Sequence, residues 1–131
     1  MKIDKYIIHS EIRGNLFAID FDKLPFEPKR SFLVYGVPEG FERGNHAHIN
    51  TNQYLICLNG ILQIKVNNGK TENSIYLTKG DGVLIDKMIW DSQIFYGNAI
   101  LLVLCDTNYD GNDYIRDYEK YKDYCNLLIK H

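Results

Sequence analysis

The sequence has 131 residues, of which 45% are hydrophobic and 24% are charged. These values are typical of one folded domain and exclude a disordered chain, which lacks the apolar side chains needed to offset the entropy of ordering. Fifteen basic and seventeen acidic side chains give a formal net charge of -2. Nucleic-acid binding is therefore not expected to be the main function.

The cysteines indicate a reducing compartment. Cys57, Cys105 and Cys125 are odd in number and widely spaced, which argues against a zinc knuckle or a disulfide framework. The longest apolar stretch, Ala99 to Cys105, is far too short to cross a bilayer, and the start of the chain does not have the pattern of a secretory signal. We expect a single cytoplasmic domain over residues 1–131, with no membrane contact.

The first hundred residues are predicted to form short strands separated by turns. Leu62, Ile64 and Val66 alternate with polar residues, which is the period of a half-buried strand. The segment 99–105 shows no alternation, so we expect it to be buried on both faces. The predicted strands cover residues 5–9, 16–20, 32–37, 54–58, 62–66, 74–77, 82–85 and 99–105, with a break at Asn59-Gly60 and a hairpin turn at Asn67-Asn68-Gly69.

The pattern changes near the C-terminus. Tyr114, Tyr118, Tyr121 and Leu128 fall at helical spacing, and Asp113 is a plausible N-cap. The sequence therefore predicts an all-β protein, a single-domain jelly-roll barrel, with a short C-terminal helix or two. Such a barrel offers an interior for one small ligand.

The segment from Gly40 to Gly60 carries the sharpest motif. His46 and His48 stand two residues apart, so on a strand they point to the same face. Their spacing from Gly40 and Gly60 resembles the first motif of the cupin superfamily, with Gln53 at the position of the usual acid. The resemblance to cupins covers about residues 32–105.

The second cupin motif is incomplete. Asp91 stands where a further histidine is usual, so the candidate ligands are His46, His48, Gln53 and Asp91. This is a poor set for iron or manganese, and we expect no metal. Histidines without a metal can act as acid or base near neutral pH. The alternatives are a metal-dependent cupin enzyme and a histidine pair with only hydrogen-bonding roles in the barrel.

Three arginines stand beside predicted strand edges. Arg13, Arg30 and Arg43 are each placed near one end of a strand. Arginine matches phosphate oxygens in bidentate geometry and keeps its charge when partly buried. Three of them near one barrel mouth would suit a diphosphate, and the alternative is ordinary surface charge.

A longer resemblance covers about residues 12–121. Three segments carry it: Arg13-Gly14-Asn15-Leu16, then Pro25-Phe26 with Lys29-Arg30, then Arg43 to His48. Together with the tail from Asn108 to Tyr118, they are similar to the nucleotide-sugar 3,4-ketoisomerases, which act on dTDP-4-keto-6-deoxyglucose.

This resemblance implies a cupin that works without metal or cofactor. It implies a homodimer that exchanges N-terminal strands, and a product used by an aminotransferase for 3-amino-3,6-dideoxyhexoses of surface glycans. His48 would be the base and His46 its assistant. Arg13, Arg30 and Arg43 would hold the diphosphate or the sugar, and we add Gln53 and Trp90 as further substrate contacts.

Two departures from that family affect the expected chemistry. Phe32 and Leu33 stand where tyrosines are common, which leaves Tyr35 as the nearest hydroxyl, and Trp90-Asp91 replaces Trp-His. With few hydroxyls available for a second acid, the galacto product is favoured over the gluco product. A non-catalytic sugar-nucleotide-binding module is the alternative from another class, and a 3,5-epimerase is a weaker one.

Overall fold

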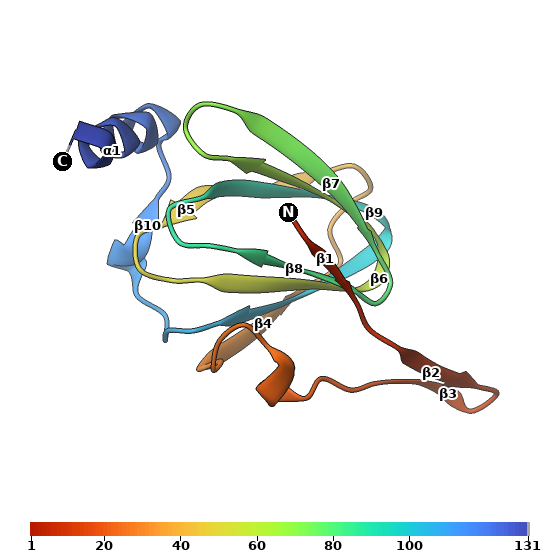
Figure 1. The fold of residues 1–131 in the computed structure, drawn as a ribbon. Helices are drawn as coiled ribbons and strands as arrows, with labels where there is room; N and C mark the ends of the chain where they lie inside the picture. Colours follow the sequence, from red (N-terminus) through yellow and green to blue (C-terminus); the bar gives the residue numbers. More distant parts are fainter. Residues whose placement is uncertain (131) are drawn as a thin grey trace.

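The computed structural model describes residues 1–130; the last residue of the predicted domain, His131, lies outside the described part. Strands form most of the chain and one α-helix closes it (Figure 1). The strands are β1 (Ile3–Lys5), β2 (Ile8–Glu11), β3 (Gly14–Phe17), β4 (Arg30–Val34), β5 (Glu42–His48), β6 (Gln53–Asn67), β7 (Glu72–Thr78), β8 (Asp81–Ile85), β9 (Trp90–Cys105) and β10 (Tyr114–Ile115). The helices are the 3-10 turns η1 (Phe21–Lys23) and η2 (Gly111–Asp113) and the α-helix α1 (Tyr118–Lys130).

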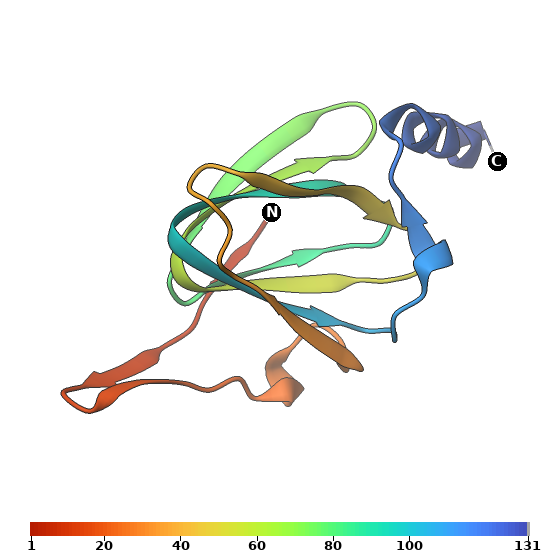
Figure 2. The same ribbon diagram turned by 180° about the vertical axis from the view of Figure 1, so that it is seen from behind.

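Two long strands, β6 and β9, pair with each other along their length and build both walls of the barrel. The first sheet consists of β1, β8, the start of β6, the end of β9 and β4. The second sheet consists of β7, the end of β6, the start of β9, β5 and β10. The two sheets face each other, as the views from opposite sides show (Figures 1 and 2).

Gly60 allows β6 to pass from one sheet to the other. Its φ is +71°, and a Cβ there would lie 2.5 Å from the carbonyl oxygen of Tyr96. Only glycine has both the conformation and the room. The predicted break at Asn59-Gly60 is therefore wrong in one respect, because the strand bends there and continues.

The core lies between the two sheets. It is filled by side chains such as Leu55, Leu62, Ile64 and Leu101, each 1% exposed or less. A second apolar cluster covers the outer face of the first sheet. Alternate residues of the segment 99–105 enter the two clusters, which confirms that both faces of this segment are buried.

The start of β9 was not among the predicted strands. Asp91, Ser92 and Gln93 interrupt the apolar pattern there, yet all three are buried. Periodicity cannot find a strand whose buried positions are polar. Of the three, Gln93 lines the cavity described below.

The C-terminal helix is confirmed, but it begins at Tyr118, four residues later than an N-cap at Asp113 predicts. Tyr114 lies in β10 and pairs with His48 of β5. Tyr121 attaches the helix to the barrel, because the single hydrogen of its hydroxyl is shared between the carbonyl oxygens of Met88 (2.7 Å) and Asn67 (3.0 Å). No helix within residues 1–130 is long and apolar enough to span a membrane.

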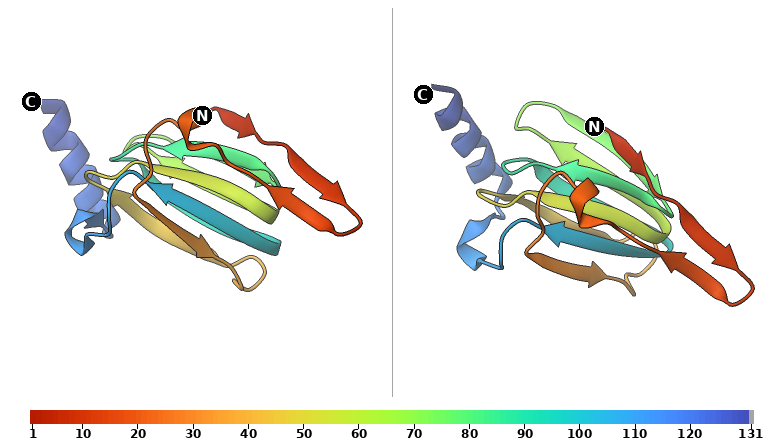
Figure 3. Two further views of the ribbon diagram at one scale, coloured as in Figure 1. Left: turned by 90° about the horizontal axis from the view of Figure 1, so that it is seen from below. Right: turned by 60° about the horizontal axis from the view of Figure 1, so that its bottom comes forward.

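The hairpin formed by β2 and β3 projects from the barrel (Figure 3). Within residues 1–130 these two strands pair only with each other. Ile7, Ile12 and Leu16 are 76%, 102% and 60% exposed. An apolar hairpin that leaves its own barrel in this way is unusual for an isolated chain.

Candidate active site

A cavity of about 340 Å³ opens between the two sheets. The first sheet gives it a wall that is apolar apart from Arg30 and Gln53, and the second sheet gives it a polar wall. The lining residues are Arg30, Phe32, Val34, Arg43, Gly44, His46, Gln53, Leu55, Gln93, Leu101, Val103, Tyr114 and Arg116. Predicted site residues Arg30, Arg43, His46 and Gln53 are therefore brought together here.

Strand β5 places the two histidines on one face. A bulge between Gly44 and His46, with Asn45 at φ 58°, shifts the register just before them. The rings of His46 and His48 lie edge to face with centroids 5.0 Å apart. His46 lines the cavity, whereas His48 is 6% exposed and is not among the lining side chains.

His48 belongs to a chain of hydrogen bonds. Its Nδ1 lies 3.1 Å from Oδ2 of Asp113, and that carboxylate also accepts hydrogen bonds from Thr51 Oγ1 (2.6 Å) and from the backbone N–H of Asn50 (2.6 Å). An ionised carboxylate only accepts hydrogen bonds, so Nδ1 carries the proton and Nε2 keeps its lone pair. Nε2 is buried and has no hydrogen-bond partner within the described structure.

The electrostatics keep both imidazoles neutral near pH 7. Burial lowers the pKa of His48, although the Asp113 carboxylate partly offsets the effect. Burial and the neighbouring His48 and Arg116 lower the pKa of His46 to about 4. Burial opposes ionisation of Asp113, but hydrogen bonds from Thr51 and its neighbours hold its pKa below the usual range. The histidine–carboxylate pair therefore has the charges that a general base requires.

Three guanidinium groups reach the cavity. Arg30 and Arg43 were predicted, and Arg116 joins them. The Arg116 guanidinium lies over the ring of Tyr114, 4.2 Å from its centroid. Such a group of arginines can bind a diphosphate in bidentate fashion.

The remaining predicted site residues lie elsewhere in this chain. Arg13 is at the turn of the projecting hairpin, where it pairs with Glu11 at 2.8 Å. Tyr35 is 70% exposed and does not line the cavity. Trp90 faces away from the interior because the next residue of β9 faces inward, and its ring packs against Tyr118 of α1 at 5.2 Å.

The sequence interpretation missed Asp113, Tyr114, Arg116 and Gln93. Asp113 was expected to be a helix cap, which is wrong, because η2 and β10 bring its carboxylate to His48. The rings of Tyr114 and His48 lie 4.3 Å apart. Asp113, Tyr114 and Arg116 lie in the segment 108–118, which carries part of the family resemblance. That resemblance was the sequence signal that could have identified them.

Asp91 is fully enclosed beside the site. Gln93 Nε2 donates to its Oδ2 at 2.5 Å, and burial raises the pKa of Asp91 to about 7. Gln53, at the acid position of the cupin motif, has its Nε2 3.7 Å from the Cys105 sulfur. Within residues 1–130 no group of three or more His, Cys, Asp or Glu side chains is placed to hold a metal ion.

Comparisons with known proteins identify the family. A family model described as "FdtA: WxcM-like, C-terminal" matches residues 1–126. A TDP-4-oxo-6-deoxy-alpha-D-glucose-3,4-oxoisomerase of Aneurinibacillus thermoaerophilus is 34% identical over 123 residues, 92% of this chain and 87% of that protein. The chain belongs to the FdtA/WxcM-like family of dTDP-sugar 3,4-ketoisomerases. It is therefore an isomerase, a sugar-nucleotide 3,4-ketoisomerase with the cupin fold.

Solved ketoisomerase structures superpose on nearly the whole chain. A His-to-Asn mutant of QdtA from Thermoanaerobacterium thermosaccharolyticum, in complex with TDP-4-keto-6-deoxyglucose, is 30% identical with a TM-score of 0.86, covering 96% of this chain and 94% of that one. Two proteins from Campylobacter jejuni are each 36% identical. WlaRA, a TDP-fucose-3,4-ketoisomerase, has a TM-score of 0.83 and covers 98% and 97% of the two chains. WlaRB, a TDP-quinovose 3,4-ketoisomerase, has a TM-score of 0.81 and covers 93% and 96%.

Proposed function

We propose that the protein converts dTDP-4-keto-6-deoxy-D-glucose into a dTDP-3-keto-6-deoxyhexose of the galacto configuration, with His48 as the base. The observation that carries this proposal is the His48–Asp113 pair. Its Nε2 is free, and the His48 ring contacts His46 and Tyr114, which line a cavity with three arginines. The diphosphate binds Arg30, Arg43 and Arg116, and the sugar ring lies between the two sheets.

The reaction moves protons only. The ketone at carbon 4 acidifies the hydrogen on carbon 3, and His48 Nε2 takes that proton while the oxygen on carbon 4 gains one, giving an enediol. Carbon 4 then receives a proton, the hydroxyl on carbon 3 loses one, and the ketone is left at carbon 3. No electron acceptor is needed. A neutral imidazole at pH 7 suits the first step.

Charge on the enediolate oxygen is met by groups beside the base. Tyr114 and Arg116 line the same side of the cavity as His46 and can donate to that oxygen, while the neutral His46 ring hydrogen-bonds the backbone of Gly44. Donors fixed in place before the reaction stabilise a developing oxyanion without reorganisation.

The two walls of the cavity support the galacto product. In that product the new hydrogen on carbon 4 lies on the same ring face as the one lost from carbon 3, so one base can serve both steps. The side chains of the facing wall are apolar apart from Arg30 and Gln53, and neither a guanidinium nor an amide acts as a proton donor to carbon near pH 7. A gluco product needs a donor from the opposite face.

The projecting hairpin supports a homodimer with exchanged N-terminal strands. Its exposed Ile12 and Leu16 would be covered by a second copy. Arg13, far from its own cavity, would then serve the partner's site. We place the reaction in the cytoplasm, where free cysteines such as Cys57 and Cys105 are stable, and ahead of a sugar aminotransferase.

Proton NMR in heavy water tests the proposal. Incubated with dTDP-4-keto-6-deoxyglucose, the protein is expected to form a 3-keto sugar with deuterium at carbon 4. In product molecules that keep hydrogen at carbon 4, the H4–H5 coupling is expected to be small, as an equatorial H4 requires. A His48→Asn variant is expected to bind dTDP normally and to give no product. Normal turnover by that variant removes the proposed base, and a large coupling indicates the gluco product. Binding without turnover by the unaltered protein contradicts the proposed substrate and reaction.

A further inference from the structure

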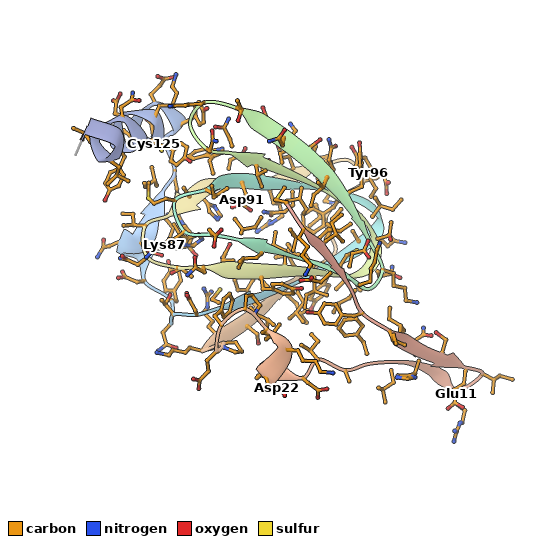
Figure 4. All side chains as sticks on the ribbon, in the orientation of Figure 1. Glu11, Asp22, Lys87, Asp91, Tyr96 and Cys125 are labelled. Atoms are coloured by element: carbon orange, nitrogen blue, oxygen red, sulfur yellow. The ribbon has the colours of Figure 1, made fainter. Side chains whose placement is uncertain are left out.

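Two polar side chains of β9 are buried in the barrel interior. Asp91 is 1% exposed and Gln93 is 7% exposed, and both lie on the face of β9 that points inward. Figure 4 shows Asp91 between the strands of the barrel. Burying a carboxyl group and an amide costs free energy unless both are hydrogen-bonded. Apolar side chains would fill this space at lower cost, so filling the core does not explain why these two residues are here.

The contact between the two residues fixes one end of the Gln93 amide. Its Nε2 donates to Asp91 Oδ2 at 2.5 Å. On the other side the same nitrogen lies against Gly44 of β5, where a Cβ would stand only 3.2 Å from it. The nitrogen is therefore enclosed, while the side chain also lines the cavity. The amide oxygen is the end left for a ligand.

Gln93 also stands next to the reacting part of the site. Asp91 is the cross-strand partner of His46, and Gln93 is the cross-strand partner of Arg43. Arg43 and His46 lie on either side of Gly44 in β5, and the absence of a side chain at Gly44 leaves room in the cavity between the two pairs. A ligand whose diphosphate contacts Arg43 and whose reacting carbons lie near His46 therefore lies against the Gln93 amide.

We propose that Gln93 contacts the sugar of the substrate, accepting a hydrogen bond from a ring hydroxyl through its amide oxygen, and that Asp91 is the positioning residue that holds the amide in that orientation. The inference rests on the proposed substrate. A buried amide oxygen left without a donor is unfavourable, so the pair selects sugars that carry a hydroxyl at that place. An apolar wall alone cannot make this selection.

Calorimetric binding tests the proposal without needing turnover. The ligands are dTDP and dTDP-6-deoxygalactose (dTDP-fucose), which has the sugar but cannot react by this route. Gln93→Leu is expected to weaken dTDP-fucose binding about tenfold, the value of one buried hydrogen bond, and to leave dTDP binding within about twofold. Gln63→Leu is the matched control, since Gln63 lies on the same barrel at a half-buried position that does not line the cavity.

Variants of Asp91 separate positioning from packing. Asp91→Leu is expected to weaken dTDP-fucose binding as Gln93→Leu does, and the double variant no further, because both act through one amide. Asp91→Asn keeps an acceptor for Nε2 and is expected to retain the affinity. The proposal is overturned if Gln93→Leu weakens both ligands equally or neither, or if the two effects add. A protein that shows these affinities but no turnover overturns the proposed reaction and leaves the role of Gln93 standing.

Discussion

At the scale of single residues, the state of His48 is decided by its hydrogen-bond partner. Asp113 accepts from Nδ1 and thereby leaves the lone pair on Nε2. Thr51 in turn lies between Asp113 and Thr107, with both of its oxygen contacts at 2.6 Å. Thr51 thus fixes the orientation of the Asp113 carboxylate, and the carboxylate fixes the orientation and the tautomer of the His48 imidazole.

Asp113→Asn is expected to lower kcat by about 10²- to 10⁴-fold while dTDP affinity is kept. The amide can donate to Nδ1 and so favours the tautomer with the proton on Nε2. Because the Asp113 charge raises the pKa of His48, its loss should also move the acid limb of the kcat–pH profile to lower pH. Steady-state assays from pH 5 to 8 measure both effects.

Asp110→Asn is the control for that experiment. Asp110 precedes the same 3-10 turn, but its carboxylate only accepts from the backbone N–H of Asn112. This variant should leave kcat and the pH profile unchanged. If Asp113→Asn behaves in the same way, Asp113 does not set the tautomer of His48.

At the scale of elements, the hairpin β2–β3 stands apart from the barrel. Glu11 is at its tip in Figure 4, next to the turn that carries Arg13. The hairpin has no third strand within the described residues, and it contacts the barrel at its base, where Phe17 packs in the outer apolar cluster. A two-stranded hairpin of this kind is marginally stable by itself. Its exposed apolar side chains therefore favour a role against a second copy of the chain.

Complementation between two inactive chains tests that role. Arg13→Ala and His48→Asn are each expected to be poorly active as homodimers. Mixed after reversible dissociation, they should regain about a quarter of the wild-type activity, since half of the dimers carry one complete site. Native mass spectrometry confirms the mixed dimers. Mixed dimers without a gain in activity show that Arg13 does not act on the partner's site.

At the scale of the whole molecule, one buried carboxyl group, that of Asp91, makes the free energy of unfolding depend on pH. Burial raises the pKa of Asp91 from 3.8 to about 7. Between these values the folded state keeps a proton that the unfolded chain has lost. Stability therefore falls as the pH rises through this window, by up to about 4 kcal/mol in total, and the loss is complete above the folded pKa.

Asp91→Asn removes this contribution. The stability of the variant relative to the wild type should rise steadily from pH 4 to pH 7 and then level off. Urea unfolding at several pH values measures the difference, in which the opposite effect of His46, whose pKa is lowered, is common to both proteins and cancels. Parallel stability curves would show that Asp91 is ionised in the folded protein at all these pH values.

The sequence by itself determined the class of the fold and the family. Alternation at Leu62, Ile64 and Val66 and the apolar run at 99–105 predict strands because side-chain burial in a sheet repeats every two residues. The spacing of His46 and His48 predicts a shared face for the same reason. These are local rules, and the structure bears them out.

Only the tertiary structure decided which residues meet. Asp113 reaches His48 from 65 positions away, and Arg116 takes a place at the cavity that the sequence interpretation had given to Arg13. Trp90 and Asp91 are adjacent in the chain but face opposite sides of β9. Contacts of this kind depend on strand order and register. Both are set by the packing of the whole barrel, so they cannot be predicted from the spacing of residues along the chain.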